Sequence, residues 1–210
     1  NWESVATTVK AIEPDIVVNC IGIIKQLRES KDPIHAITLN SLFPHQLSMI
    51  CREVKARLIQ ISTDCVFSGA KGDYIEEDMP DATDLYGRTK SLGELYDSHC
   101  VTIRTSIIGH ELSSNHSLID WFLSENGMVK GYSKAIYSGF PTVELSRILA
   151  DYVFPNKDLS GLYHVSSEPI SKYELLKLVA EEYKKEILIQ PDDKIICNRS
   201  LNSDKFRTIT

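Results

Sequence analysis

Two short stretches of the sequence hold side chains whose types and spacing could move a proton. Thr63 closes the apolar run of residues 56–63, and Tyr86 and Lys90 stand four residues apart shortly afterwards. Residues four apart on a helix share a face, so the phenol and the ammonium can be neighbours. A nearby cation favours the phenolate and lowers the pKa of a tyrosine from about 10. Such a tyrosine can give a proton to a carbonyl oxygen while hydride reaches the carbon, or take one in reverse.

Each part of this pattern also has a plain structural explanation. Ser, Thr and Asp are common in turns, so residues 62–64 could be a loop without chemistry. A tyrosine four residues before a lysine arises often by chance, and Lys90 could instead pair with Glu94. The conjunction favours proton transfer: a hydroxyl ends a buried strand, and the Tyr–Lys pair opens a helix 23 positions after Thr63.

Parallel strands and helices must hold these side chains together. Continuous apolar runs predict three buried parallel strands, at residues 14–22, 56–63 and 100–109. Apolar residues at helical spacing predict a helix of about 20 residues from Pro33, and Asp84 is the predicted N-cap of another. In open sheets of this kind, ligands bind beyond the carboxyl ends of the strands, where Thr63 lies. The sequence therefore predicts an α/β fold with a doubly wound, parallel, Rossmann-like sheet.

After residue 110 the pattern changes to shorter elements. Helices are predicted at 116–126, 142–154 and 171–186, and short strands at 134–139, 161–166 and 186–191. Ser171 and Glu174 form a capping box that opens the last helix. We therefore expect a Rossmann-like domain over 1–110 and a smaller mixed α/β region over 111–210, with a return to the first domain around 138–154.

Composition excludes several classes of function. The chain has 210 residues, 42% of them hydrophobic, and its formal net charge of −6 argues against binding to nucleic acid. Its five cysteines are odd in number and lack a C-x-x-C pair, which predicts reduced thiols and neither a disulfide framework nor a metal site. The longest apolar stretch is far shorter than the roughly 20 residues of a membrane span. We expect a cytoplasmic protein with no membrane partner.

Several motifs together resemble one family. "ISTDCVFSG", "YIEED", "LYGRTKSLGE" and "IRTS" resemble the extended short-chain dehydrogenase/reductase family, and more narrowly its dTDP-4-dehydrorhamnose reductase (RmlD-like) branch. "VVNCIG", "GFPT" and "GLYHVSS" are similar as well, so the resemblance covers essentially the whole chain. It implies that residues 1–110 are the remaining part of an NAD(P)-binding domain and that 111–210 bind mainly substrate.

The resemblance also implies roles for individual residues. Tyr86 would be the acid/base, Lys90 would hold the cofactor ribose and lower the tyrosine pKa, and Thr63 would hydrogen-bond the substrate carbonyl. The cofactor would be NADP or NAD, with NADPH or NADH as hydride donor. Implied cofactor-binding residues are Cys20, Ile21, Gly22, Asn40, Ser62, Tyr86 and Lys90. Implied substrate-binding residues are Thr63, Asp64, Cys65, Ile107, Pro141 and Thr142.

Three of these residues have equally weighted or competing structural explanations. Asn40 resembles the family's helix asparagine near the site, but an asparagine in a helix can also bond locally. Pro141 with Thr142 could shape the substrate pocket or simply form a loop. Arg104 is expected to anchor structure after its strand rather than to touch substrate.

The chain also departs from the family pattern. The reductase branch usually has aromatic residues where this chain has Cys65 and Ile107, so its substrate need not be dTDP-4-dehydrorhamnose. Trp121, Tyr132 and Tyr137 could supply replacement stacking surfaces, although aromatics in such stretches more often belong to the core. No glycine-rich dinucleotide fingerprint is present, and the chain begins at Asn1 without methionine, in mid-helix by pattern. We therefore expect a fragment whose first two βα units precede it.

The leading hypothesis is NAD(P)H-dependent reduction of a nucleotide-activated 4-keto-deoxysugar, in deoxysugar and surface polysaccharide synthesis. One alternative keeps the fold but makes the protein a nucleotide-sugar epimerase or dehydratase. Another is a non-catalytic regulatory subunit, as some relatives in this branch are. The family resemblance also allows a homodimer.

Overall fold

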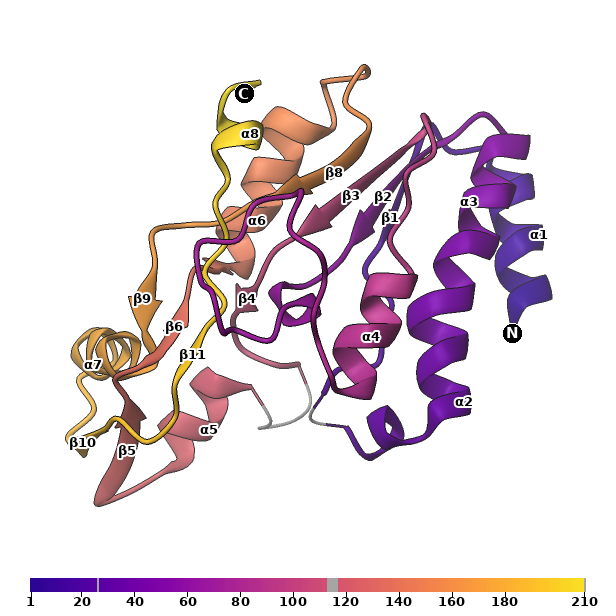
Figure 1. Ribbon diagram of the computed structural model, residues 1–210. Coiled ribbons are helices and arrows are strands. Elements are labelled where there is room, and N and C mark those ends of the chain that lie inside the picture. The colour runs from indigo at the N-terminus through magenta and orange to yellow at the C-terminus, as the bar shows by residue number, and fades with distance from the viewer. Residues whose placement is uncertain (26, 113–116, 210) are drawn as a thin grey trace.

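A parallel four-stranded sheet forms the centre of the molecule. The structure is a computed structural model, and it describes residues 1–25, 27–112 and 117–209. The strand order is β1-β2-β3-β8, and all three neighbouring pairs are parallel. The strands are β1 (Ile16–Asn19), β2 (Arg57–Ile61), β3 (Cys100–Arg104) and β8 (Gly161–His164). The predicted α/β fold with a parallel sheet is confirmed (Figure 1).

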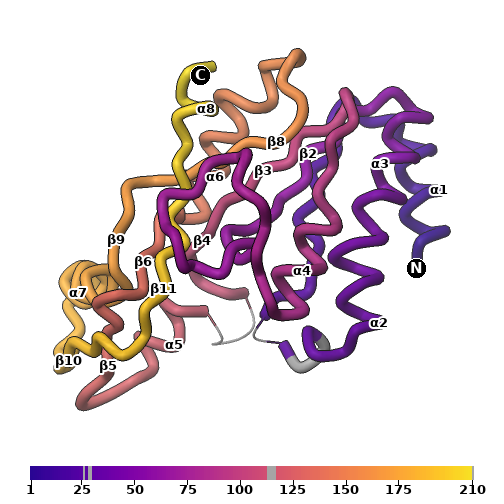
Figure 2. Tube along the Cα trace, viewed as in Figure 1, coloured from indigo at the N-terminus to yellow at the C-terminus, as the bar shows by residue number. Residues whose placement is uncertain are grey.

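Helices cover both faces of this sheet because successive strand residues point to opposite sides. On one face, Leu58 packs in a cluster with Leu47, which lies on α3 (Phe43–Glu53), and α1 (Trp2–Ile12) adds partly buried residues. On the other face, Ile59 packs with Leu145 of α6 (Thr142–Ile148) and with the π-helical turn Leu149–Val153. The short helix α8 (Asp204–Arg207) adds Phe206 to that second cluster. Figure 2 shows the N-terminus beside α3 and the C-terminus beyond β8.

The predicted long helix from Pro33 is continuous but contains a wider turn. It runs as α2 (Pro33–Ala36), a π-helical turn (Ile37–Leu42) and then α3. π-Helical turns are rare and often occur at functional sites. Asn40 lies in this turn and is buried.

The second half builds three small sheets around a separate apolar cluster. β5 (Met128–Tyr132) pairs with β10 (Leu188–Asp192), and β4 (Ile107–Ile108) pairs with β7 (Phe140–Pro141). A third sheet has the order β11-β6-β9, formed by Cys197–Asn198, Ala135–Tyr137 and Ile170–Ser171. Helices α5 (Leu118–Ser124) and α7 (Lys172–Glu182) pack their apolar residues against these strands.

Local signals in the sequence locate several of these elements correctly. Asp84 caps α4 (Leu85–Leu92) by accepting from the Gly87 N–H at 2.9 Å, and Ser171 caps α7. The run predicted as one strand at 100–109 is two strands, β3 and β4. The Asn1 side chain caps α1 by accepting from the Ser4 N–H at 2.9 Å. Residue 116 of the predicted helix 116–126 lies outside the described residues.

Within the range 138–154 predicted for the return, Leu145, Leu149 and Val153 pack on the central sheet, and strand β8 then joins that sheet at residues 161–164. The division of the chain at residue 110 stays a prediction. No helix in the described part of the chain is long and apolar enough to cross a membrane.

Candidate functional site

The structure brings Thr63 and Tyr86 together at the carboxyl end of the central sheet. β2 ends at Ile61, and Thr63 then caps a short 3-10 helix (Asp64–Val66) by accepting from the Cys65 N–H at 3.1 Å. Tyr86 lies in the first turn of α4, close enough to Thr63 for that residue to affect the pKa of its phenol. Two residues 23 apart in sequence therefore face each other.

A close backbone approach at Gly87 makes this arrangement possible. A Cβ atom at position 87 would lie 2.2 Å from the carbonyl oxygen of Cys65 and 2.5 Å from Ala82 Cβ. Any side chain larger than hydrogen would push α4 away from the 3-10 helix. Gly87 thus lets the helix carry Tyr86 up to Thr63.

Lys90 is tied to the same strand end. Its ammonium donates a hydrogen bond of 2.8 Å to the carbonyl oxygen of Ile61, two residues before Thr63. The side chain is buried, and burial lowers its pKa to about 8, while the charge of Glu94 opposes that fall. Glu94 forms its ion pair with Arg104, so the alternative Lys90–Glu94 ion pair is not formed.

The pKa of Tyr86 differs from the expectation of a lowered value. Burial raises it, nearby Cys65 and Asp64 raise it further, and the neighbouring Thr63 hydroxyl opposes the rise. Lys90 is not among the groups that change it most, because its ammonium is directed to the Ile61 carbonyl. In the chain by itself, the phenol is therefore held in its protonated form.

The loop after β1 lies next to Lys90. Cys20, Ile21 and Gly22 are exposed, and a Cβ at Gly22 would lie 3.7 Å from Lys90 Nζ and 3.2 Å from Asn40 Oδ1. The backbone of this loop can thus approach a ligand that also reaches the ammonium. The structure thus places the loop with the predicted cofactor-binding residues Cys20, Ile21 and Gly22 beside Lys90.

Asn40 fixes the position of that loop. Its side chain accepts from the Ile23 N–H at 2.9 Å and donates to the Ile23 carbonyl oxygen at 3.2 Å and to Thr89 Oγ1 at 3.3 Å. These bonds join segments 17 and 49 residues away, so Asn40 does not bond locally within its helix. It connects the loop after β1 to α4 between Tyr86 and Lys90.

Ser62 is bonded within the fold, and its predicted part in cofactor binding stays a prediction. Its hydroxyl donates to Glu94 Oε1 at 2.8 Å. Glu94 in turn accepts from Arg104 Nε at 2.7 Å and Nη2 at 2.8 Å, and both charged side chains are 1% exposed. Arg104 therefore anchors structure, as expected.

His164 ends this buried network. Arg104 Nη1 donates to its Nε2 at 3.2 Å, so Nδ1 carries the proton and donates to the Tyr74 carbonyl oxygen at 3.0 Å. Burial lowers the pKa of His164 to about 4, and the Arg104 charge adds to that effect. The imidazole is thus neutral near pH 7.

Asp64 and Cys65 line the other side of the Thr63–Tyr86 pair. Asp64 is buried and accepts from the Thr63 hydroxyl at 3.2 Å, and burial raises the pKa of its carboxyl. Burial also raises the pKa of the Cys65 thiol to about 12, which keeps it protonated. A thiol in that state is a space-filling group rather than a nucleophile.

The remaining predicted substrate residues gather around the β4–β7 pair. Ile107 is 44% exposed and pairs with Phe140, Pro141 is exposed, and Thr142 Oγ1 donates to the Ile108 carbonyl oxygen at 3.2 Å. β4 starts two residues after Thr105, whose carbonyl accepts from the Asp64 N–H at 3.1 Å. This pair of strands is therefore connected to the site through one backbone bond.

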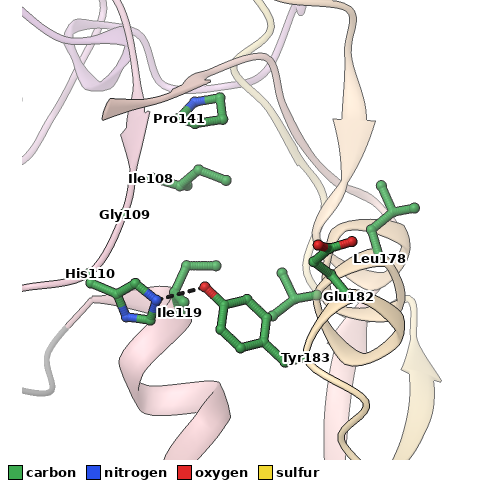
Figure 3. Close-up of a pocket in the computed structure, with 9 residues that line it drawn as sticks. Ile108, Gly109, His110, Ile119, Pro141, Leu178, Glu182 and Tyr183 are labelled. Atoms are coloured by element: carbon green, nitrogen blue, oxygen red, sulfur yellow. Dashed lines mark hydrogen bonds between the residues drawn. The ribbon is translucent and has the colours of Figure 1, made fainter. Parts of the chain in front are cut away.

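A mainly apolar cavity of about 280 Å³ opens beside Pro141 (Figure 3). It lies between β4, β7, α5 and α7. At its lower end in the view, His110 Nε2 forms a 2.7 Å hydrogen bond with the Tyr183 hydroxyl, and His110 Nδ1 one of 2.6 Å with Asp120. Thr63, Tyr86 and Lys90 do not line this cavity.

One charged residue of the site carried no signal in the sequence. Arg199 donates from Nε to the Phe67 carbonyl oxygen at 2.8 Å and from Nη1 toward Cys65 Sγ at 3.9 Å. Its charge acts on Asp64. These contacts span more than 130 residues, so sequence spacing could not reveal them. Within the described residues, no group of three or more His, Cys, Asp or Glu could hold a metal ion.

The arrangement can perform acid–base chemistry at one point. A protonated phenol and a hydroxyl face each other, with a buried ammonium one helical turn away and an accessible loop backbone beside it. This set can hold a carbonyl oxygen and deliver a proton to it.

Comparison with known proteins gives a consistent result. A family model described as "RmlD substrate binding domain" matches residues 1–195. The dTDP-4-dehydrorhamnose reductase of Escherichia coli (strain K12) is 31% identical over 199 residues, covering 88% of this chain and 65% of the reductase. The β subunit of methionine adenosyltransferase 2 from Danio rerio is 26% identical, covering 86% of this chain and 59% of that protein.

Solved structures agree on the fold. A dTDP-4-dehydrorhamnose reductase from Bacillus anthracis, in complex with NADP, superposes with a TM-score of 0.84 at 20% identity, covering 99% of this chain and 79% of that one. The chain described here thus spans about two thirds of the length of the curated reductase and less of the adenosyltransferase subunit.

Proposed function

This chain belongs to the RmlD substrate binding domain family, and we propose that it serves the NAD(P)H-dependent reduction of a nucleotide-activated 4-keto-deoxysugar. One observation carries the proposal. The Thr63 hydroxyl, the Tyr86 phenol and the Lys90 ammonium converge at the end of β2, because Lys90 bonds to Ile61 and Tyr86 lies against Thr63. The reductase from Escherichia coli, at 31% identity, supports the same class of reaction.

The residues present fit a nicotinamide cofactor. Lys90 uses one of its three donors on Ile61, which leaves two for ribose hydroxyls. The backbone of Cys20, Ile21 and Gly22 is accessible beside it, in a space that a Cβ at Gly22 would enter. NADP in the Bacillus anthracis structure supports this choice, and NAD is the alternative. When bound, the nicotinamide supplies a hydride.

The chain's own residues then handle the proton. On binding, Thr63 turns its hydroxyl proton from Asp64 to the sugar carbonyl oxygen and orients it, and Tyr86 transfers its phenolic proton to that oxygen as the carbon accepts hydride. The products are an alcohol and the oxidised nicotinamide, so protons and electrons balance. The Lys90 ammonium, one helical turn away, holds the cofactor ribose while it bonds to the Ile61 carbonyl oxygen. Asp64 and Cys65 face the sugar, and Ile107, Pro141 and Thr142 border it further out.

We infer a cytoplasmic role in deoxysugar and surface polysaccharide synthesis, with a nucleotide sugar as substrate and a homodimer as the assembly. The replacement of aromatic residues by Cys65 and Ile107 supports a sugar other than that of dTDP-4-dehydrorhamnose.

The direct test is oxidation of NADPH or NADH by the complete protein with nucleotide 4-keto-6-deoxysugars. We expect Tyr86→Phe to lose turnover by about 10²- to 10⁴-fold, because the proton donor is removed while the ring stays. Cofactor affinity should be kept. Tyr152→Phe, at a 46% exposed tyrosine away from the site, is the matched control. Normal turnover by Tyr86→Phe would refute the assignment.

A regulatory subunit is the second candidate, favoured by the similarity to the adenosyltransferase β subunit over 86% of this chain. In that case the wild-type protein binds NADPH or NADH but does not oxidise either of them when a sugar nucleotide is added. An epimerase of the same fold would convert a nucleotide sugar without net consumption of NAD(P)H.

A further inference from the structure

The cavity of about 280 Å³ beside Pro141 takes no part in the proposed proton transfer, because none of the three proposed catalytic residues lines it. Its walls are mainly apolar, and two of the side chains that line it, Ile119 of α5 and Val179 of α7, are buried. An apolar cavity of about 150 Å³ is large enough to bind benzene. This cavity therefore has room for a phenyl ring with a short chain, and the few polar groups at its edge decide which compound it accepts.

The polar end of the cavity presents a hydrogen-bond acceptor. The Glu111 N–H and the His110 ring hold the pKa of Asp120 below its usual range, so its carboxylate accepts from His110 Nδ1 at 2.6 Å. A neutral imidazole with its proton on Nδ1 accepts at Nε2. The Tyr183 hydroxyl lies 2.7 Å from Nε2 and donates its single proton there (Figure 3). The phenol oxygen thus keeps its lone pairs for a donor group of a ligand.

Glu182 adds a negative charge on the same side of the cavity. It lines the cavity, and its carboxylate forms no ion pair or hydrogen bond with any residue that the structure describes. The lysine three residues later does not neutralise it, since Lys185 donates to the Leu123 carbonyl oxygen of α5 at 2.8 Å. Helix α7 ends at Glu182 without a basic residue in its last turn, so the negative end of the helix dipole adds to this charge.

We propose that this cavity binds a small primary amine whose apolar body is about the size of a phenyl ring. The ring packs on Ile119 and Val179, and the ammonium donates to the Tyr183 oxygen and to the Glu182 carboxylate. The face of the tyrosine ring attracts the same cation.

The charge at this cavity separates the amine site from the proposed sugar-nucleotide site. The Tyr183 oxygen and the Glu182 carboxylate are both acceptors, and a diphosphate offers only acceptors with negative charge in return. Repulsion from Glu182 and from the end of α7 therefore excludes phosphate groups, in a chain whose net charge is already −6. A cation with an apolar body is the complementary ligand, and the proposal does not depend on the reductase activity.

Titration of phenethylamine into the complete protein at pH 7, followed by ligand-observed NMR, tests the proposal. We expect a dissociation constant of about 0.1–1 mM, which is appropriate for a ligand of this size. 2-Phenylethanol has the same shape without the charge and should bind about fivefold more weakly, whereas 3-phenylpropionate carries a negative charge and should show no binding.

Two variants at exposed positions separate the charge from the hydrogen bond. Glu182→Gln should bind phenethylamine about fivefold more weakly and 2-phenylethanol as before, because only the charge is removed. Tyr183→Phe keeps the ring and removes the oxygen, so both ligands should bind about threefold to fivefold more weakly. Glu181→Gln is the matched control, since Glu181 is an exposed carboxylate of the same helix that does not line the cavity. It should bind both ligands like the wild type.

Equal affinity of Glu182→Gln and the wild type for phenethylamine would overturn the site, as would a wild type that binds 3-phenylpropionate equally well. Displacement of the amine by UDP would overturn it too, because the cavity would then be part of the sugar-nucleotide site. Failure of the proposed function leaves the site untouched. A protein that oxidises no NADPH but loses phenethylamine affinity in Glu182→Gln, and not in Glu181→Gln, keeps the amine site.

Discussion

Lys90 donates a 2.8 Å hydrogen bond to the backbone carbonyl of Ile61, which joins helix α4 directly to the end of strand β2. The same strand end continues to Thr63, so one bond sets the distance between the ammonium and the hydroxyl. Because the acceptor is backbone, replacing the side chain of Ile61 leaves the bond intact. The lysine is therefore both a charge for the site and a structural connection.

The pH dependence of stability should report the burial of Lys90. Its pKa in the folded chain is about 8, against 10.5 ordinarily, so between these values the unfolded chain binds more protons. The free energy of unfolding therefore gains a term that rises with pH through this window, by at most about 1.4 kcal/mol per pH unit. Urea denaturation at pH 7 and pH 9.5 should show this term in the wild type and not in Lys90→Met.

Lys157→Met is the control for that measurement, because Lys157 is exposed. It should keep the pH dependence of the wild type. Identical pH dependence in Lys90→Met and the wild type would mean that the ammonium is solvated and not buried as described.

Gly22→Ala should weaken cofactor binding with little change in stability. The added methyl would lie 3.2 Å from Asn40 Oδ1 and 3.7 Å from Lys90 Nζ, in the space where the loop backbone meets the ammonium. Gly22 is exposed, so the fold does not depend on that space. We expect the dissociation constant for NADPH, measured by fluorescence titration, to rise about tenfold.

Ile21→Ala is the matched variant for Gly22→Ala. Its side chain is 52% exposed and its proposed contribution is through backbone, so affinity should stay unchanged. Equal affinity of Gly22→Ala and the wild type would argue that the cofactor does not approach this loop.

Local signals predicted the fold and part of the site, and long-range contacts account for what the sequence did not reveal. Asp84 and Ser171 are caps whose partners lie three residues away, so sequence spacing identifies them. Lys90 chooses a backbone carbonyl 29 residues away, which no side-chain pattern encodes. Ser62 donates its hydroxyl proton to Glu94, 32 residues away, a partner that spacing cannot identify either. Arg199 reaches Cys65 from a distant segment, which spacing cannot foresee.

His164 should make the fold less stable in acid. Its pKa is about 4 in the folded chain against 6.5 ordinarily, so between these values the unfolded chain binds more protons. Stability falls as pH drops from 6.5 to 4, by up to about 3 kcal/mol from this group. Thermal unfolding at pH 4.5 and pH 7 should show a smaller difference for His164→Gln. If the difference in thermal stability between pH 4.5 and pH 7 is the same in His164→Gln and in the wild type, groups other than His164 cause the acid sensitivity.

Breaking the buried Glu94–Arg104 ion pair should cost far more stability than breaking an exposed ion pair. In Arg104→Met, the Glu94 carboxylate stays buried without its cationic partner, and its Oε1 keeps the hydrogen bond from the Ser62 hydroxyl. His164 Nε2 also loses the hydrogen bond that Arg104 donates. Breaking a buried pair in this way costs about 3–5 kcal/mol. Urea denaturation should show that loss, whereas Arg147→Met, in the exposed pair with Glu144, should change stability by about 0.5 kcal/mol or less.

The double variant Glu94→Gln/Arg104→Met distinguishes loss of the pair from loss of packing. Removing the second charge relieves the uncompensated carboxylate, so the double variant should be more stable than Arg104→Met. If the two variants are equally unstable, the cost lies in the packing of the Arg104 side chain and not in the ion pair.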